Sequence, residues 1–170
     1  MSEELKIIDN IRKQGFRPQV VGCFIYNSKI LFLYKKEHNL WQFPQGGIEN
    51  EETIQQALKR EMTEELGKDF INNCDLSNPL IFNEQQLKFP SSSKGFRELK
   101  TDLEEKIKMK GKRYFFIKIP TNKTKIKINQ TEFDDYQWLT FAEASSKAKE
   151  IYQKGKRQLT LKAIESLKNS

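Results

Sequence analysis

Three glutamates near the middle of the chain have a spacing that could hold a metal ion. Glu61, Glu64 and Glu65 are separated by three and four positions, which places side chains on one side of an α-helix. Like charges gathered in this way repel one another, so a stable fold is expected to compensate them. Mg²⁺ binds carboxylate oxygens together with substrate phosphates. The cluster therefore indicates metal-dependent phosphate chemistry, although a solvent-exposed acidic helix face has the same pattern.

The residues around these glutamates predict the helix that carries them. Apolar residues recur every four positions and form a stripe for the core: Ile54, Leu58, Met62 and Leu66. Helix-forming residues predominate over 52–66, and Gly67 is suited to ending the helix. At about 100° per residue, Glu61 and Glu65 lie beside the apolar stripe and Glu64 lies further round. The carboxylates are therefore expected at the border between core and solvent.

The whole pattern over 46–67 resembles the Nudix box. In that pattern a glycine is followed, at fixed spacings, by Glu, Arg-Glu, an apolar residue, Glu-Glu and a second glycine. The matching residues are Gly46, Glu52, Arg60, Glu61, Met62, Glu64, Glu65 and Gly67. Because every fixed charge and glycine is present, the match is far more specific than a short glycine motif. The next position is usually apolar and is Lys68 here, but it is not a catalytic position.

Other segments resemble the bacterial RNA 5′-pyrophosphohydrolases and the related dinucleoside polyphosphate hydrolases of this family. They are 16–22, 41–48 (WQFPQGGI), 112–116, 131–138 and 155–157. The resemblance covers roughly residues 15–165 and is weakest over 72–110. It implies an α+β Nudix fold, which is an αβα sandwich with a mixed β-sheet. The length suits one domain over 1–170, and helical spacing over 1–14 predicts an N-terminal helical extension.

The resemblance also implies roles for four acidic residues. Glu64 and Glu65 would be the principal metal ligands, and Glu61 would be a further ligand or the base that activates water. Glu132 occupies the position of another ligand or base from a distant loop, although loop glutamates are ordinarily solvated. The implied cofactor is Mg²⁺, for which Mn²⁺ could substitute. These four residues are the predicted catalytic set.

The remaining residues of the box are expected to shape the site. Glycine lets the backbone approach a metal or phosphate, so the carbonyl of Gly46 or Gly47 is a further candidate ligand. Glu52 and Arg60 are expected to form a supporting pair that holds the loop and the helix together. Gly67 completes this structural set.

The net charge of +7 favours a polyanionic substrate, although a lysine-rich surface that serves only solubility has the same charge. The candidates for binding substrate phosphates are Arg17, Lys35, Lys36, Lys112, Lys156 and Arg157. Together with their neighbours in 108–113 and 154–157, these cations bracket the motifs and could meet in the fold.

We therefore expect Mg²⁺-dependent hydrolysis of phosphoanhydride bonds, with removal of pyrophosphate from 5′-triphosphate RNA as the first hypothesis. A dinucleoside polyphosphate such as diadenosine tetraphosphate is the alternative substrate, and a non-catalytic nucleotide-sensing module is a second alternative that the intact glutamates disfavour. One departure concerns RNA recognition. The RNA-processing relatives carry an aromatic residue at the position of Gly155. Residues that could replace it are Tyr152, Phe82, Phe89 and Phe96.

Composition disfavours several other classes of protein. No apolar run approaches the length of a membrane span, and the N-terminus lacks the pattern of a signal peptide. We expect a cytoplasmic enzyme without an obligate protein partner. The single histidine, His38, is expected in a surface loop, which leaves little support for a Ser-His-Asp mechanism. Cys23 is expected to be a buried reduced thiol, with a disulfide or ligand role as the alternative.

Local patterns predict the remaining elements. Strands are expected at 19–26, 29–34, 80–89, 113–119 and 136–139, and helices at 3–13, 141–153 and 157–168. Asn27-Ser28 is predicted to form a hairpin turn. A loop is expected at 90–95, and 99–107 is expected to be a short helix or a flexible excursion.

Overall fold

The longest strand, β1 (Phe16–Tyr26), runs through the middle of a mixed sheet and pairs on both sides. The computed structural model describes residues 2–90 and 97–170. The sheet also contains β2 (Lys29–Lys35), β3 (Leu40–Gln42), β4 (Gln45–Gly47), β5 (Leu80–Lys88), β8 (Gly111–Pro120) and β9 (Asp135–Thr140). The order is β3-β2-β1-β8-β5, with β4 paired to β1 and β9 paired to β2. Between the strands of this sheet that the structure describes, only the pairing of β1 with β8 is parallel.

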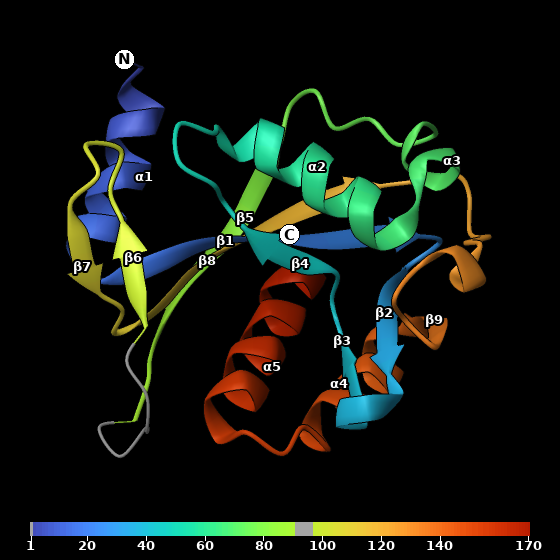
Figure 1. Cartoon of the computed structure of the whole chain (residues 1–170). Coiled ribbons are helices and arrows are strands. Elements are labelled where there is room, and N and C mark those ends of the chain that lie inside the picture. Colours follow the sequence, from blue (N-terminus) through green and yellow to red (C-terminus); the bar gives the residue numbers. More distant parts are fainter. Residues whose placement is uncertain (1, 91–96) are drawn as a thin grey trace.

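Helices cover both faces of this sheet (Figure 1). α2 (Ile54–Leu66) and α3 (Lys68–Ile71) cover one face, where they pack on Phe24, Leu31 and Phe115. α4 (Phe141–Lys149) and α5 (Lys154–Lys168) cover the other face in a second core cluster. The arrangement is the predicted αβα sandwich, and the α+β class is confirmed.

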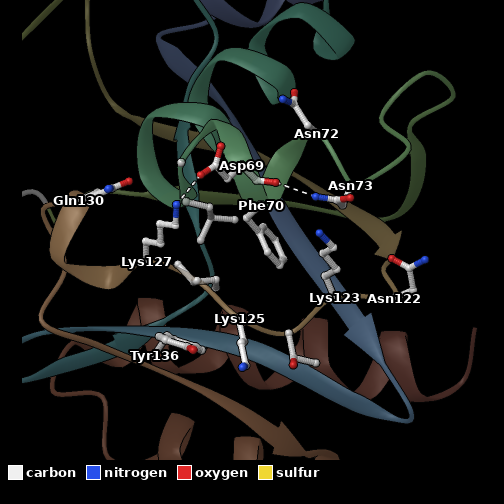
Figure 2. A pocket seen from close by; sticks show the side chains of 14 residues that line it. Asp69, Phe70, Asn72, Asn73, Asn122, Lys123, Lys125, Lys127, Gln130 and Tyr136 are labelled. Atoms are coloured by element: carbon white, nitrogen blue, oxygen red, sulfur yellow. Dashed lines mark hydrogen bonds and ion pairs between the residues drawn. The ribbon is translucent and has the colours of Figure 1, made fainter.

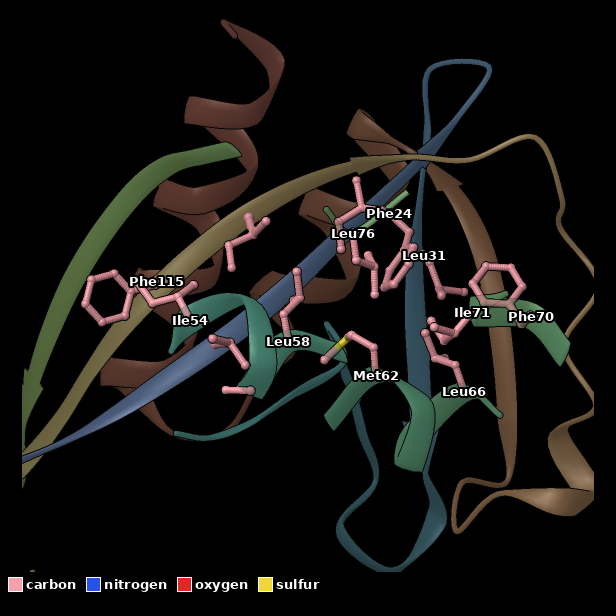
Figure 3. Close-up of a cluster of buried hydrophobic side chains, with 14 of the residues drawn as sticks. Phe24, Leu31, Ile54, Leu58, Met62, Leu66, Phe70, Ile71, Leu76 and Phe115 are labelled. Carbon is pink, nitrogen blue, oxygen red and sulfur yellow. The ribbon is translucent and has the colours of Figure 1, made fainter. Parts of the chain in front are cut away.

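The predicted apolar stripe of α2 is buried against the sheet. Leu58 and Met62 are fully buried and Leu66 is 1% exposed, and Figure 3 shows them in one row along the helix. The helix approaches β1 closely at Gly22, where an added Cβ would lie 2.6 Å from Met62 Sδ. Glycine at position 22 therefore sets how closely the helix with the three glutamates can pack on the sheet.

Most local predictions are confirmed. α1 (Glu3–Lys13) forms the N-terminal extension, and both Asn27 and Ser28 have positive φ angles (46° and 60°), as a tight two-residue hairpin requires. α4 ends at Lys149 and α5 begins at Lys154, so both boundaries differ by a few residues from the prediction. The loop predicted at 90–95 lies, apart from Pro90, outside the described residues.

The prediction for 99–107 was wrong. This segment lies in a hairpin of two strands, β6 (Glu98–Lys100) and β7 (Lys106–Lys108). Leu99 and Met109 are both 8% exposed, and opposite charges face each other across the strands at Glu98–Lys108. The high charge content suggested an unstructured segment, but those charges alternate with buried residues and so suit a strand.

Among the described residues, no helix combines the length and the apolar character that crossing a lipid bilayer requires.

Candidate active site

The helix α2 begins at a capping box immediately after the glycine loop. The Thr53 hydroxyl accepts a hydrogen bond from the backbone N–H of Gln56 (3.2 Å), and the Gln56 side chain accepts one from the N–H of Thr53 (2.9 Å). Both bonds satisfy N–H groups that would otherwise lack partners at the first turn. The cap fixes the start of the helix at Ile54, two residues later than predicted. It thereby also fixes the direction of the glutamates, which follow about two to three turns further on.

Arg60 ties this helix to the loop that precedes it. Its guanidinium donates two hydrogen bonds to Glu52 (2.8 and 2.9 Å), one to the Gly47 carbonyl (2.9 Å) and one to Glu61 (2.7 Å). The geometry is that of a bidentate Arg–carboxylate pair, which is both strong and directional. Arg60 and Glu52 therefore lie where the prediction put a supporting pair, and the Gly47 carbonyl is already engaged.

We call Glu61, Glu64, Glu65 and Glu132 the acidic cluster, and Glu65 is its most buried member. It is 8% exposed, and its carboxylate accepts a hydrogen bond from the backbone N–H of Gln45, with N–O distances of 3.2 and 3.3 Å. Burial raises the pKa of Glu65 to about 8. The hydrogen bond opposes this shift, and the negative charges of Glu61, Glu132 and Glu64 add to it. The fold thus brings Glu132 from a distant loop to the three glutamates of α2.

The other carboxylates differ in their surroundings. Glu61 packs against Gly46, where any side chain would overlap its carboxylate. Burial raises the pKa of Glu61, against the effect of its hydrogen bond to Arg60. The Glu64 side chain is 60% exposed and lies 3.7 Å from Arg60, and Glu132 is also exposed. The cluster therefore grades from a buried carboxylate to two that solvent can reach.

The donor chemistry of this cluster fits a hard divalent cation. Within the part of the chain that the structure describes, no three His, Cys, Asp or Glu side chains are gathered as a ready-made metal site. However, Glu65 is a buried carboxylate beside three other glutamates, and burial together with their charges raises its pKa. A cation with oxygen ligands, such as Mg²⁺ or Mn²⁺, would offset the negative charge of these carboxylates.

A second network, which the sequence did not predict, holds the glycine loop from the N-terminal side. Arg12 of α1 is 3% exposed and donates hydrogen bonds to the carbonyls of Ile48 (3.1 Å) and Glu49 (2.8 Å). The same guanidinium lies 3.3 Å from carboxylate oxygens of Asp9 and Asp102. The N-terminal extension and the β6–β7 hairpin are therefore joined to the loop that leads into α2.

Cations gather in a groove beside the acidic cluster. The groove lies between the end of β5, the β6–β7 hairpin, the start of β8 and the start of α5, and its volume is about 830 Å³. We call it the basic groove. Its basic residues are Lys88, Arg97, Lys108, Lys110, Lys112, Lys154 and Lys156, and none of its described lining residues is acidic. The runs 108–113 and 154–157 thus meet in space, as the sequence suggested they could.

Three of the predicted phosphate-binding residues connect the basic groove to the acidic cluster. Burial, assisted by the positive charges of Arg17, Lys156 and Arg97, lowers the pKa of Lys112 to about 8. Arg17 is paired with Lys112 in register across β1 and β8 and packs against Gly47. Burial lowers the pKa of Lys156, and the negative charge of the nearby Glu65 acts in the opposite direction. Cations and carboxylates therefore meet at Glu65.

The other three predicted phosphate-binding residues have contacts outside the basic groove. Lys35 donates to the backbone carbonyl of Glu132 (2.5 Å) and lies over the Phe133 ring, so it positions the Glu132 loop. The exposed Lys36 is anchored through its backbone N–H to Asp134 (2.7 Å). Arg157 donates to the carbonyl of Ile151 (3.0 Å) within the α4–α5 connection. None of the three lines the basic groove.

Another hollow, of about 1030 Å³, lies between α3 and the segment 122–130 (Figure 2). Of the predicted site residues only Gly67 borders it. Its Lys127 is paired with Asp69 at 2.7 Å, and both side chains are mostly exposed. The predicted phosphate-binding residues Lys112 and Lys156 line the basic groove instead.

The single histidine is exposed, and Cys23 lies in the core. The side chain of His38 is 64% exposed in a short 3₁₀ turn, 36–38, as expected for a surface loop. Cys23 is a fully buried free thiol whose pKa is raised by burial, and Cys74 is also free. A reduced thiol at Cys23 is confirmed.

Comparison with known proteins agrees with this geometry. The family model described as NUDIX domain matches residues 16–161. The RNA pyrophosphohydrolase of Acinetobacter baylyi is 28% identical, over 89% of this chain and 92% of that protein. The RNA pyrophosphohydrolase of Pasteurella multocida is 31% identical, over 85% and 73%. The E. coli dihydroneopterin triphosphate pyrophosphohydrolase structure superposes with a TM-score of 0.63 at 17% identity, over 91% and 99%, which shows the shared fold.

Proposed function

Given that the chain belongs to the NUDIX family and is a hydrolase of phosphoanhydride bonds, we propose that its substrate is 5′-triphosphate RNA. In the proposed reaction, water cleaves an anhydride bond, and the products are 5′-monophosphate RNA and pyrophosphate. The observation that carries this proposal is the meeting of the acidic cluster and the basic groove at Glu65. A group of carboxylates suited to a metal ion and a surface suited to a polyanion would there act on one substrate.

The acidic residues would divide the work at the reacting phosphates. Glu61, Glu64 and Glu65, with the carbonyl of Gly46, would hold the cofactor, and Glu132 would add a ligand or accept a proton from water. Bound Mg²⁺, or Mn²⁺ in its place, would neutralise phosphate charge and lower the pKa of water. Arg60 would keep Glu61 aligned through its 2.7 Å hydrogen bond.

The cations beside the cluster would bind the phosphates that do not react. Lys112 and Lys156 are partly buried, and burial lowers the pKa of each. A bound phosphate would stabilise their charged forms, because an opposite charge raises the pKa of an ammonium group. Arg17 extends this set toward Gly47, where it would contact the triphosphate from the loop side.

The continuation of the basic groove favours RNA over a dinucleoside polyphosphate. A dinucleoside polyphosphate has its negative charges in one short chain, which Arg17, Lys112 and Lys156 suffice to bind. RNA carries a further phosphate at each nucleotide, and the groove has further cations such as Lys108 and Lys110. Two relatives described as RNA pyrophosphohydrolases support the same choice. We also propose that the enzyme acts in the cytoplasm.

A substrate panel tests this function. Purified protein with Mg²⁺ is given 5′-triphosphate RNA, diadenosine tetraphosphate and free nucleoside triphosphates, and kcat/KM is measured for each. We expect the highest value for the RNA, with release of pyrophosphate. A clear preference for diadenosine tetraphosphate would replace RNA with the alternative substrate, and absence of hydrolysis on all substrates would favour a nucleotide-sensing module.

A matched pair of variants tests the metal assignment. Glu64→Gln removes a predicted ligand that is mostly exposed, so the fold should be retained. Its activity should fall by more than the roughly 100-fold that changes outside the ligand shell cost. Glu165→Gln, an exposed glutamate on α5, is the control and should keep full activity. Full activity of Glu64→Gln would contradict the assignment.

A further inference from the structure

The outer part of the basic groove contains an aromatic ring as well as cations. Phe89 lines the groove, is half-buried and follows directly after the end of β5. Its backbone N–H donates to the carbonyl of Lys110 (2.8 Å), so the chain at this point is held in line with β8. Leu87, two residues earlier, also lines the groove, as expected for side chains on the same side of an extended chain.

The neighbouring position on α5, Gly155, carries no ring. An added Cβ at Gly155 would lie 2.6 Å from the Leu87 side chain, so Leu87 fills the space beside this residue. Tyr114 also borders the groove but is only 4% exposed. The exposed aromatic surface among the described lining residues is therefore that of Phe89.

Cations flank this ring along the β6–β7 hairpin and the start of β8. Arg97, Lys108 and Lys110 all line the groove and are exposed. Aromatic faces beside a track of cations are the features that bind single-stranded nucleic acid, because bases stack on the rings and phosphates pair with the cations. A double helix would keep its bases stacked on each other and could not use the ring.

We propose that the outer basic groove is a binding site for the single-stranded RNA chain that follows the 5′ end. A base would stack on Phe89, and backbone phosphates would bind Arg97, Lys108 and Lys110. This inference rests on the proposed function for the orientation of the RNA, with its triphosphate at Glu65. It assigns a role to the hairpin that interrupts the chain between β5 and β8.

The test compares RNA lengths in three variants. The substrates are 5′-triphosphate RNAs of two and eight nucleotides, and kcat/KM is measured in Mg²⁺ over a series of KCl concentrations. The variants are Phe89→Leu, the double variant Lys108→Gln/Lys110→Gln, and the control Lys149→Gln, an exposed lysine on α4 outside the groove. Thermal melting of each variant shows whether it has folded.

The wild type should prefer the longer RNA, and the preference should depend on the groove. Phe89→Leu should reduce the ratio of the two kcat/KM values by about 5- to 150-fold, the range for loss of one stacked base. For the eight-mer, the slope of log kcat/KM against log salt concentration should be shallower by about 1.4 in the double lysine variant. This follows from about 0.7 for each of the two lost phosphate contacts. Lys149→Gln should change neither quantity. Equal kcat/KM for both lengths in the wild type, or an unchanged ratio in both groove variants, would overturn the proposal.

A binding measurement separates this proposal from the proposed function. A fluorescent single-stranded eight-mer with a 5′-hydroxyl group cannot be hydrolysed, so its Kd reports on the groove alone. If no triphosphate RNA is cleaved, the proposed function fails. In that case, binding that weakens in the groove variants but not in Lys149→Gln would still support the site. Binding that is absent, or equal in all variants, would reject it.

Discussion

Replacement of Arg12 by methionine should greatly lower the free energy of unfolding. The guanidinium is buried with the two carboxylates that it contacts, since the side chains of Arg12, Asp9 and Asp102 are 4%, 7% and 2% exposed. One oxygen of Asp102 is buried without a hydrogen-bond partner among the described residues. In the variant, both carboxylates would lose their cation and the carbonyls of Ile48 and Glu49 would lose a donor.

The expected loss follows from these contacts. Removal of one partner from a buried ion pair costs about 3–5 kcal/mol, because a charge is left buried and uncompensated. A domain of this kind is typically stable by about 5–15 kcal/mol, so the loss would be a large fraction of the total. The Arg113–Glu84 pair provides the control, because its side chains are 32% and 42% exposed and a surface pair contributes about 0–1 kcal/mol.

Urea denaturation followed by tryptophan fluorescence measures the effect. The free energy of unfolding should fall by about 3–5 kcal/mol in Arg12→Met and by no more than about 1 kcal/mol in Arg113→Met. Arg12→Lys should lie between the wild type and Arg12→Met, because one ammonium group cannot reach all four acceptors. Equal losses in Arg12→Met and Arg113→Met would refute the view that this network holds the loop.

Three further predictions concern the helix α2 and its glutamates. Arg60→Lys should lower kcat/KM by about 10- to 100-fold with the fold retained, because an ammonium group cannot bridge Glu52, Glu61 and the Gly47 carbonyl together; steady-state kinetics would contradict this if kcat/KM were unchanged. In EDTA the free energy of unfolding should fall as pH rises from about 4.5 to about 8, because folding raises the pKa of Glu65 and so favours its protonated form. Urea titrations at pH 5 and 8 should show a smaller difference in the free energy of unfolding for Glu65→Gln than for the wild type, and an equal difference would argue against this carboxylate as the cause. Gly22→Ala should lower the free energy of unfolding by about 1–3 kcal/mol, because the added methyl group overpacks against Met62. An unchanged melting temperature would contradict this and show that α2 can move away from β1.

The sequence by itself determined the elements whose causes are local. The four-residue apolar period of α2, the primed turn at Asn27-Ser28 and the spacing of Glu61, Glu64 and Glu65 each depend on neighbours within a few positions. Such patterns act through backbone geometry that is the same in any fold. For this reason the helix α2, most strands and the family resemblance could be predicted. The strands within 99–107 were not predicted, because the charges there masked an alternating pattern.

Tertiary structure decided which distant side chains meet. Arg12 and Asp102 are separated by 90 positions, and the basic groove collects Lys88, Lys112 and Lys156 from three different elements. It also decided that Lys35 supports the Glu132 loop, whereas Lys112 faces the groove. Charge carries no periodic signal of its partner in the sequence. Electrostatic contacts depend on distance and burial, and both are set only when the sheet brings β1 beside β8 and α5 beside β5.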